Sequence, residues 1–197
     1  TAVALPMAVL LALGRRSQWP VLSNGCAAFI EMVRGVPLVS VIFMASFMLP
    51  LLLPAGQVPD VLWRVSLALT LFLAAYLAEV VRGGLQGVSR GQTLAAKSLG
   101  LSEFHIQRHV VLPQALQHCL PGLINHLIGI FKDTSLVTIV SLYELSGALS
   151  LALSGDADWR PYKIEAYLFI ALIYFVFCFG LSCYSQRWQQ RLQLRTT

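Results

Sequence analysis

The hydrophobic positions of this chain fall into long runs that are separated by short polar stretches. Five runs stand out, at residues 1–13, 36–53, 61–81, 116–140 and 164–184. A helix needs roughly 20 apolar residues to cross the hydrocarbon core of a bilayer, and the last four runs come near this length. The pattern therefore predicts an all-α integral membrane protein with five spans.

The first apolar run and the two polar stretches at residues 19–35 and 54–60 predict different structures. Residues 1–13 are too few for a complete span, so we expect the chain to begin inside a longer protein, with the upstream half of this span missing. Residues 19–35 mix apolar positions with Asn24, Glu31 and Arg34, which predicts an amphipathic helix at the membrane interface. The link at residues 54–60 is rich in turn residues and predicts a tight connection.

Composition agrees with a membrane protein. Apolar residues make up 57% of the 197 positions and charged residues 12%, whereas about a quarter of the residues in soluble proteins are charged. The formal net charge is +5. In a membrane protein, an excess of basic residues first indicates which loops face the cytosol. The sequence contains no arginine-rich arm and no basic run interleaved with aromatic residues, so nucleic-acid binding is not predicted.

Basic residues are concentrated in alternate loops. One set of loops contains only Arg64, Arg160 and Lys163, so the positive-inside rule places the other, richer set in the cytosol. The basic residues of that richer set are Arg15, Arg16, Arg34, Arg82, Arg90, Lys97, Arg108, Arg187, Arg191 and Arg195. The long loop at residues 83–112 is therefore expected to face the cytosol.

Local sequence signals predict two short helices within this loop. Residues 92–99 are good helix formers, and Gly100 follows them where a helix end favours a residue that tolerates positive φ. Ser102 can cap a second helix that runs to residue 109, and Pro113 suits the first turn of the next helix. The pattern leaves two interpretations open: a helix-turn-helix that plugs a groove on a partner protein, or an amphipathic segment on lipid headgroups.

Charged residues within the apolar runs predict two kinds of site. Glu31 with Arg34 and Glu79 with Arg82 stand three residues apart and share helix faces, which favours structural ion pairs over a gating role. Residues 125–135 place polar groups inside a span, where they are tolerated only against protein or a water-filled path. The candidates for a substrate path, which would complement an ammonium and a carboxylate, are Asn125, His126, Lys132, Asp133, Thr134 and Ser135. Pairing of Lys132 and Asp133 with other helices remains the alternative.

Catalytic signatures are absent from the sequence. It contains no Walker loop, HExxH or GxSxG motif, so an enzyme is not predicted. His105, His109 and His118 have no carboxylates at ligand spacing, and no metal site is expected. A passive channel or a structural membrane subunit stays open on composition alone, although neither requires a cytosolic helix-turn-helix.

Several ordered motifs resemble one family of transport proteins. The loop is similar to the EAA loop of ABC importer permeases, with small residues, a glycine and a hydrophobic-Leu-Pro sequence at Ala95, Ala96, Gly100 and residues 111–113. The flanking sequences FIEMVRGVPLV, AAYLAEVVRGG, VLPQAL and FKDTSL resemble the polar amino acid uptake permeases. Within them the chain looks most like a membrane subunit of broad-specificity L-amino acid systems.

The resemblance implies a fold and a set of partners. Residues 1–197 would form one permease domain with a five-span core in a bacterial inner membrane, within which we call residues 83–112 the coupling loop. This chain would bind no cofactor, because ATP and Mg would be held by a separate ATP-binding subunit. A second permease subunit, a periplasmic amino-acid-binding protein and membrane lipid complete the expected partners. A permease for another small polar solute is the alternative.

The resemblance also assigns residues to the contact with the ATP-binding subunit. They are Gly91, Leu94, Ala95, Ala96, Gly100, Leu101, Ser102 and Phe104. The chain departs from the family pattern at Leu94, where an acidic residue usually begins the motif, and at Val36, where threonine is common. Because Leu94 cannot form the charge-assisted contact, we expect the second permease subunit to be non-identical and to keep the acid.

Overall fold

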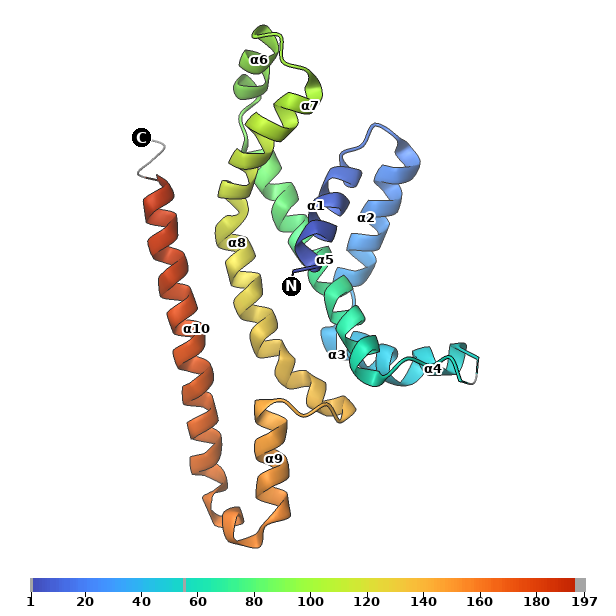
Figure 1. Cartoon of the computed structure of the whole chain (residues 1–197), viewed down its shortest axis with the longest axis vertical. Helices are drawn as coiled ribbons and strands as arrows, with labels where there is room; N and C mark the ends of the chain where they lie inside the picture. The colour runs from blue at the N-terminus through green and yellow to red at the C-terminus, as the bar shows by residue number, and fades with distance from the viewer. Residues whose placement is uncertain (1, 55, 194–197) are drawn as a thin grey trace.

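The computed structural model describes residues 2–54 and 56–193, which form helices joined by short links and contain no strand (Figure 1). Thr1 and Arg195, both used above, lie outside the described residues. Three helical stretches are long and apolar enough to cross a membrane: Val61–Gly87, Glu103–Val140 and Ala157–Gln190. The pair Pro20–Arg34 and Leu38–Leu52 would make a fourth span, broken by a bend of 100°. Of the five predicted spans, the first corresponds to the short helix Ala4–Arg15.

Helix α5 (Val61–Gly87) is the centre around which the others pack. Helices α1 (Ala4–Arg15) and α2 (Pro20–Arg34) lie along one side of it, α8 (Leu112–Asp133) packs on another, and α10 (Lys163–Gln193) lies against α8 (Figure 1). Alanines line the core where α1 meets α5, and Ala8, Ala12, Ala74 and Ala78 have no exposed surface. Small side chains let helix backbones approach closely, which is how membrane helices gain packing energy.

Gly84 shows the closest approach of α5 to α8. A Cβ atom at this position would lie 2.5 Å from the carbonyl oxygen of Ala115 and 2.8 Å from the Cβ of Cys119. Helix α5 continues through Gly83 and Gly84 to Gly87, beyond the apolar run at residues 61–81. The packing of α8 against α5 therefore requires a glycine at position 84.

Replacing Gly84 with alanine is therefore expected to separate α5 from α8 and to destabilise the protein by about 1–2 kcal/mol, as overpacking of a filled core does. The matched control is Gly83→Ala in the preceding position, where an added Cβ meets nothing within 4 Å. Thermal unfolding of the detergent-purified protein measures both. Equal midpoints for the two variants would contradict the close contact.

The chain bends sharply after α2. Helices α3 (Leu38–Phe43) and α4 (Leu49–Leu52) run crosswise to α5, while α2 stands upright beside α1 (Figure 1). We expected residues 19–35 to lie along the membrane interface, and the structure instead places them against α1 and α5. The reason is tertiary: Ile30 is completely buried in the core and Glu31 forms an ion pair with Arg15 of α1. Pro37 then disfavours helical backbone at the preceding residue and permits the bend.

Two π turns accommodate prolines within helices. Residues Met44–Met48 and Gln107–Val111 form these turns, and each directly precedes a Leu-Pro pair. Leu112 donates its N–H to the Gln107 carbonyl, so the widened turn fits the ring of Pro113 without ending the helix. Pro113 stands in the first turn of α8, as predicted. The predicted end of the preceding helix near residue 109 is wrong, because the chain is helical from Glu103 through α8 to Asp133.

Arg64 stabilises the first of the two π turns. Its Nη1 donates to the carbonyl oxygen of Ser46 at 2.6 Å and lies 3.4 Å from that of Ala45. The guanidinium thus satisfies carbonyls within the widened turn and joins the crosswise segment to α5.

Glu144 organises the end of the molecule opposite the coupling loop. Its carboxylate caps helix α9 (Leu145–Gly155) by accepting from the N–H groups of Ser146 and Gly147 at 3.0 Å, and Oε2 accepts from the Tyr174 hydroxyl at 2.7 Å. Burial alone would raise the pKa of this carboxyl, but these hydrogen bonds outweigh it and hold the pKa below its ordinary value. The carboxylate therefore joins α9 to α10 in its charged form.

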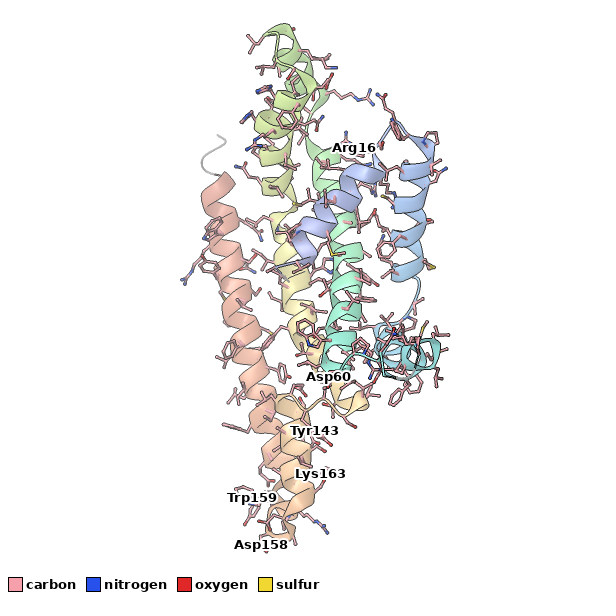
Figure 2. All side chains as sticks on the ribbon, turned by 45° about the vertical axis from the view of Figure 1, so that its right-hand side comes forward. Arg16, Asp60, Tyr143, Asp158, Trp159 and Lys163 are labelled. Atoms are coloured by element: carbon pink, nitrogen blue, oxygen red, sulfur yellow. The ribbon has the colours of Figure 1, made fainter. Side chains whose placement is uncertain are left out.

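The two ends of the molecule carry different parts of the chain. Figure 2 shows Arg16 near the end that carries the coupling loop, and Asp158, Trp159 and Lys163 at the opposite end. The apolar helices between these ends fit a multi-pass membrane protein, and the cytosolic position of the basic end stays a prediction from the charges.

Candidate functional site

A cavity of about 220 Å³ lies between α3, α5 and α8, near the middle of the chain's helical core. Most of its wall is apolar and includes Leu38, Phe72 and Leu136. Its polar groups are Tyr76, His126 and Asp133. An apolar cavity with a few convergent polar groups is the usual form of a ligand site, and this one is smaller than the roughly 300–1,000 Å³ of most such sites, so it suits only a small molecule.

The polar groups converge because of their helical spacing. His126 and Asp133 are seven residues apart on α8, or two turns, so they share the face that lines the cavity. Gly129 stands between them, and a Cβ there would meet nothing within 4 Å, which leaves room at the centre of this face. The Tyr76 ring on α5 lies 5.6 Å from the His126 ring, measured between centroids.

Asp133 is the group in this cavity with the clearest chemical consequence. Among the residues that the structure describes, no basic side chain forms an ion pair with it. A carboxylate held at membrane depth costs ~2.5 kcal/mol or more unless it is hydrated or paired. Its position on the wall of a cavity supplies room for water or for a cationic group of a ligand.

The structure separates the six residues predicted for a substrate path. His126 and Asp133 line the cavity together, whereas Asn125 and Lys132 are exposed and do not line it. Thr134 and Ser135 are half-buried at the following turn, where the Thr134 hydroxyl donates to the Phe131 carbonyl at 2.7 Å. Tyr76 was missed, although its place as a phenol within an aliphatic run was a usable signal.

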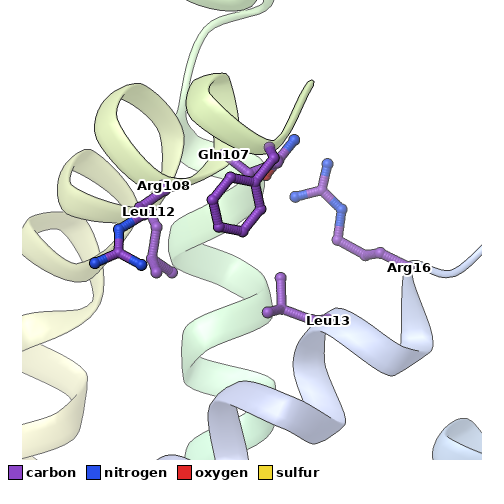
Figure 3. Close-up of a pocket in the computed structure, with 6 residues that line it drawn as sticks. Leu13, Arg16, Gln107, Arg108 and Leu112 are labelled. Carbon is purple, nitrogen blue, oxygen red and sulfur yellow. The ribbon is translucent and has the colours of Figure 1, made fainter. Parts of the chain in front are cut away.

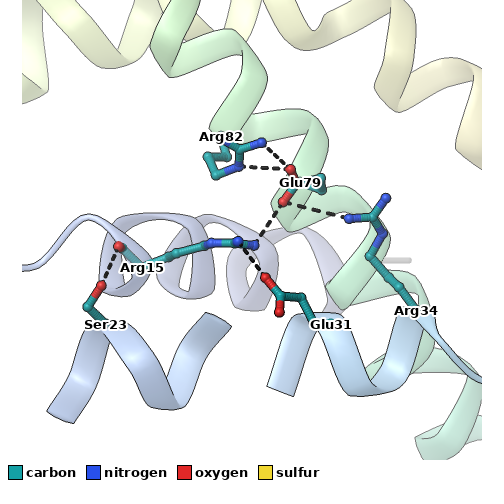
Figure 4. A network of polar contacts seen from close by, with 6 residues as sticks. All are labelled: Arg15, Ser23, Glu31, Arg34, Glu79 and Arg82. Carbon is teal, nitrogen blue, oxygen red and sulfur yellow. Dashed lines mark hydrogen bonds and ion pairs between the residues drawn. The ribbon is translucent and has the colours of Figure 1, made fainter. Parts of the chain in front are cut away.

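Beside this cavity, Glu79 joins three arginines from three helices (Figure 4). Arg82 pairs with it along α5, Arg15 of α1 approaches Oε2 at 3.2 Å, and Arg34 of α2 lies 3.8 Å from the same oxygen. Arg15 also reaches Glu31 at 2.8 Å. We call these five residues the Glu79 network.

The network confirms one predicted pair and corrects the other. Glu79 and Arg82 do pair within α5. Glu31 and Arg34 share a helix face but do not pair, because the fold brings Arg15 to Glu31 and turns Arg34 toward Glu79. Contacts between helices therefore replace the predicted contact within α2.

The Glu79 network adjoins the cavity through Tyr76. The Arg34 guanidinium lies 5.5 Å from the centre of the Tyr76 ring, within the range of a cation–π contact. The Tyr76 hydroxyl donates to the Arg34 carbonyl at 3.4 Å, next to the bend between α2 and α3. A change in the position of Tyr76 in the cavity would therefore alter its contacts with Arg34 next to the bend.

The coupling loop has the predicted helix-turn-helix form. Helix α6 (Arg90–Ser98) ends before Gly100, which has a φ of 75°, and Ser102 caps α7 (Glu103–Ile106) by accepting from the His105 N–H. Lys97 and Glu103 close the turn with an ion pair of 2.5 Å. The tip is therefore held by its own contacts.

The predicted contact residues of this loop divide by exposure. Ala96 is buried against the chain's own core and cannot meet a partner. The others are exposed, with Leu94 at 63% and Phe104 at 66%. The exposed predicted residues are Gly91, Leu94, Ala95, Gly100, Leu101, Ser102 and Phe104. Leu99, which was not predicted, is the most exposed of the loop's leucines.

In the described part of the chain, no group of three His, Cys, Asp or Glu side chains is arranged to hold an ion.

Comparison with known proteins shows a consistent set of relatives. The family described as "Binding-protein-dependent transport system inner membrane component" matches residues 4–193. The inner membrane amino-acid ABC transporter permease protein YhdY of Escherichia coli K12 is 48% identical over 196 residues, which cover 100% of this chain and 53% of that protein. The glutamate/glutamine/aspartate/asparagine transport system permease protein BztC of Rhodobacter capsulatus is 44% identical, over 97% of this chain and 44% of its own length. The chain thus spans about half the length of these relatives.

Solved structures give the same picture of the fold. A crystal structure of an amino acid ABC transporter with histidines has a chain that is 29% identical, with a TM-score of 0.84 over 96% of this chain and 86% of that one. An inward-facing structure of the MetNI methionine ABC transporter matches with a TM-score of 0.73 at 20% identity, over 96% and 86% of the two chains. The second likeness supports the fold alone.

Proposed function

This chain belongs to the family of binding-protein-dependent transport system inner membrane components, and from that premise we propose that it is a permease subunit of an ATP-driven amino acid importer. It would form part of the translocation path and transmit the work of a separate ATP-binding subunit. The relatives named for amino acid transport, at 48% and 44% identity, support this substrate class over another small polar solute.

The observation that carries the proposal is the form of the coupling loop. A passive pore needs no rigid helix-turn-helix at its cytosolic end, whereas this loop fixes its turn by an ion pair and exposes leucines and a phenylalanine to solvent. Exposed apolar residues on a rigid pair of short helices suit a groove on a partner protein. We propose that this partner is the ATP-binding subunit.

The cavity at Asp133 supplies the substrate side of the proposal. An α-amino acid carries an ammonium group, which a carboxylate recognises by a charge-assisted hydrogen bond. Asp133 would receive the ammonium, and His126 and Tyr76 would bound the remaining space. A periplasmic amino-acid-binding protein would deliver the substrate at the opposite end from the coupling loop.

We further propose that the second permease subunit is not identical to this one. Leu94 stands exposed at the position of the usual acid, so this half of the transporter lacks one charged contact with the ATP-binding subunit. A partner permease that keeps the acid would restore it on one side. An active transporter formed from this chain and the ATP-binding subunit alone would contradict this proposal.

Reconstitution tests the function as a whole. The full-length permease, co-expressed with its ATP-binding subunit, second permease and binding protein, is placed in liposomes. We expect ATP hydrolysis that depends on the binding protein loaded with amino acid, together with accumulation of that radiolabelled amino acid. Solute flux without ATP would indicate a channel instead, and accumulation of only a different solute class would reject the amino acid assignment.

Phe104→Asp tests the coupling loop directly. Because an exposed aromatic anchor at an interface is worth about 2 kcal/mol, we expect recovery of the ATP-binding subunit with the permease to weaken about 30-fold. Trp159→Asp is the control, since it introduces the same charge at an exposed aromatic of the opposite end. Unchanged co-purification of Phe104→Asp would remove this residue from the contact.

A further inference from the structure

Two adjoining cavities form a groove between the end of α1 and the coupling loop. One, of about 510 Å³, is lined by Leu13, Arg16, Phe104, Gln107, Arg108 and Leu112 (Figure 3). The other, of about 400 Å³, shares Arg16 and Gln107 with it and extends to Arg90. Both volumes lie in the roughly 300–1,000 Å³ that is usual for ligand sites. We call the two cavities together the arginine groove.

The lining of the groove is amphiphilic. Leu13, Phe104 and Leu112 provide an apolar surface in the first cavity, and Leu85, Val88 and Val111 do so in the second. Its charged residues are Arg16, Arg90 and Arg108, and no acidic residue appears among the described residues that line it. Within the described chain, none of these three arginines forms an ion pair.

The groove lies at the depth of the cytosolic headgroups. Arg16 directly follows α1, at the end of the molecule that carries the coupling loop and the basic loops (Figure 2). Leu13 and Leu112 belong to apolar helices that continue toward the membrane interior. The arginines therefore mark the boundary between the headgroup layer and the hydrocarbon core, and the apolar lining lies on the hydrocarbon side of them.

We propose that the arginine groove binds an anionic phospholipid of the cytosolic leaflet. Its guanidinium groups would hold the phosphate and the anionic headgroup, and the leucines would contact the upper part of an acyl chain. Basic pockets between helices on the cytosolic side are suited to such headgroups. Bound there, the lipid would stabilise the position of the coupling loop relative to α1.

The chemistry favours a lipid over the other anions that could reach this surface. A free phosphate would use the arginines but leave the apolar lining without a partner. The tip of the loop, where Leu99 and Leu101 are exposed and do not line the groove, stays free for the ATP-binding subunit. Leu94 and Phe104 line the groove as well as belonging to the predicted contact, so the lipid and that subunit would meet at these two residues. An amphiphile uses both kinds of surface at once.

Lipid titration tests the proposal. The full-length detergent-purified permease is titrated with phosphatidylglycerol or phosphatidylcholine of the same acyl chains, and bound lipid is counted by native mass spectrometry. We expect preferential binding of phosphatidylglycerol. Arg16→Gln and Arg108→Gln should each weaken its binding about fivefold, the change that corresponds to ~1 kcal/mol for one basic residue near an anionic headgroup. Binding of phosphatidylcholine should not change.

Arg187→Gln is the matched control, because Arg187 is an exposed arginine of α10 that lines neither cavity. It should retain the wild-type preference. Competition by inorganic phosphate alone would assign the groove to a free anion, and would overturn the proposal. The same holds if Arg16→Gln and Arg108→Gln lower recovery of the ATP-binding subunit while leaving phosphatidylglycerol binding unchanged, since the groove would then be a protein contact.

Discussion

Glu79→Gln is expected to destabilise the protein by about 2–3 kcal/mol. Three arginines converge on this one carboxylate, and its removal leaves them facing each other with Glu31 as the remaining acid of the network. Removing one partner of a fully buried ion pair costs about 3–5 kcal/mol, and the 22% exposure of the Glu79 side chain reduces this figure. Thermal or SDS-induced unfolding of the purified protein measures the change.

Glu31→Gln provides the internal comparison for this result. Glu31 belongs to the same network, but its side chain is 65% exposed and it pairs with Arg15 alone. An exposed ion pair is worth under about 1 kcal/mol, so this variant should stay close to wild type. If the two variants lost equal stability, total charge rather than the position of Glu79 would determine the effect.

The structure also explains why the network forms at this place. Arg15, Arg34 and Arg82 come from three helices whose other contacts are apolar, from the alanines of α1 and α5 to Ile30 and Leu77. Such packing brings helices close but leaves their rotation and height weakly specified. A shared carboxylate defines both, and so fixes α1 and α2 against α5.

Local features of this fold could be predicted from the sequence because their causes are local. The turn of the coupling loop follows from Gly100 and Ser102, since a positive φ and an N-cap each depend on one residue and its neighbours. The membrane class follows from the lengths of the apolar runs. His126 and Asp133 meet in one cavity because helical spacing places them on one face.

Features that depend on two helices could not be predicted in the same way. The spacing of Glu31 and Arg34 permits a pair, but the approach of α1 decides which partner each takes. Ala96 looks like an exposed contact until residues 103–111 pack against α6, and Gly84 gains its role only where α8 approaches α5. Pro113 ends a regular helix, and only the π turn before it lets the chain continue.

Asp133→Asn is expected to reduce amino acid uptake about 10- to 150-fold, on the proposed function. The substitution keeps the shape of the side chain and removes the charge that would pair with the substrate ammonium. A hydrogen bond to a charged group contributes about 1.5–3 kcal/mol, which gives this range. The loss should appear as a higher apparent KM for substrate-stimulated ATP hydrolysis in liposomes.

Two further variants separate recognition of the substrate from a general effect of charge on the membrane domain. Asp158→Asn removes an acid from the exposed turn at the opposite end of the molecule from the coupling loop and should leave the KM unchanged. Lys132→Ala should have a smaller effect than Asp133→Asn, because Lys132 is exposed and does not line the cavity. Normal uptake by Asp133→Asn would show that the ammonium is recognised elsewhere. If Lys132→Ala alone lost uptake, the substrate path would lie on the other face of α8. That face carries Lys132 and Asn125, whereas Asp133 lies on the face that lines the cavity.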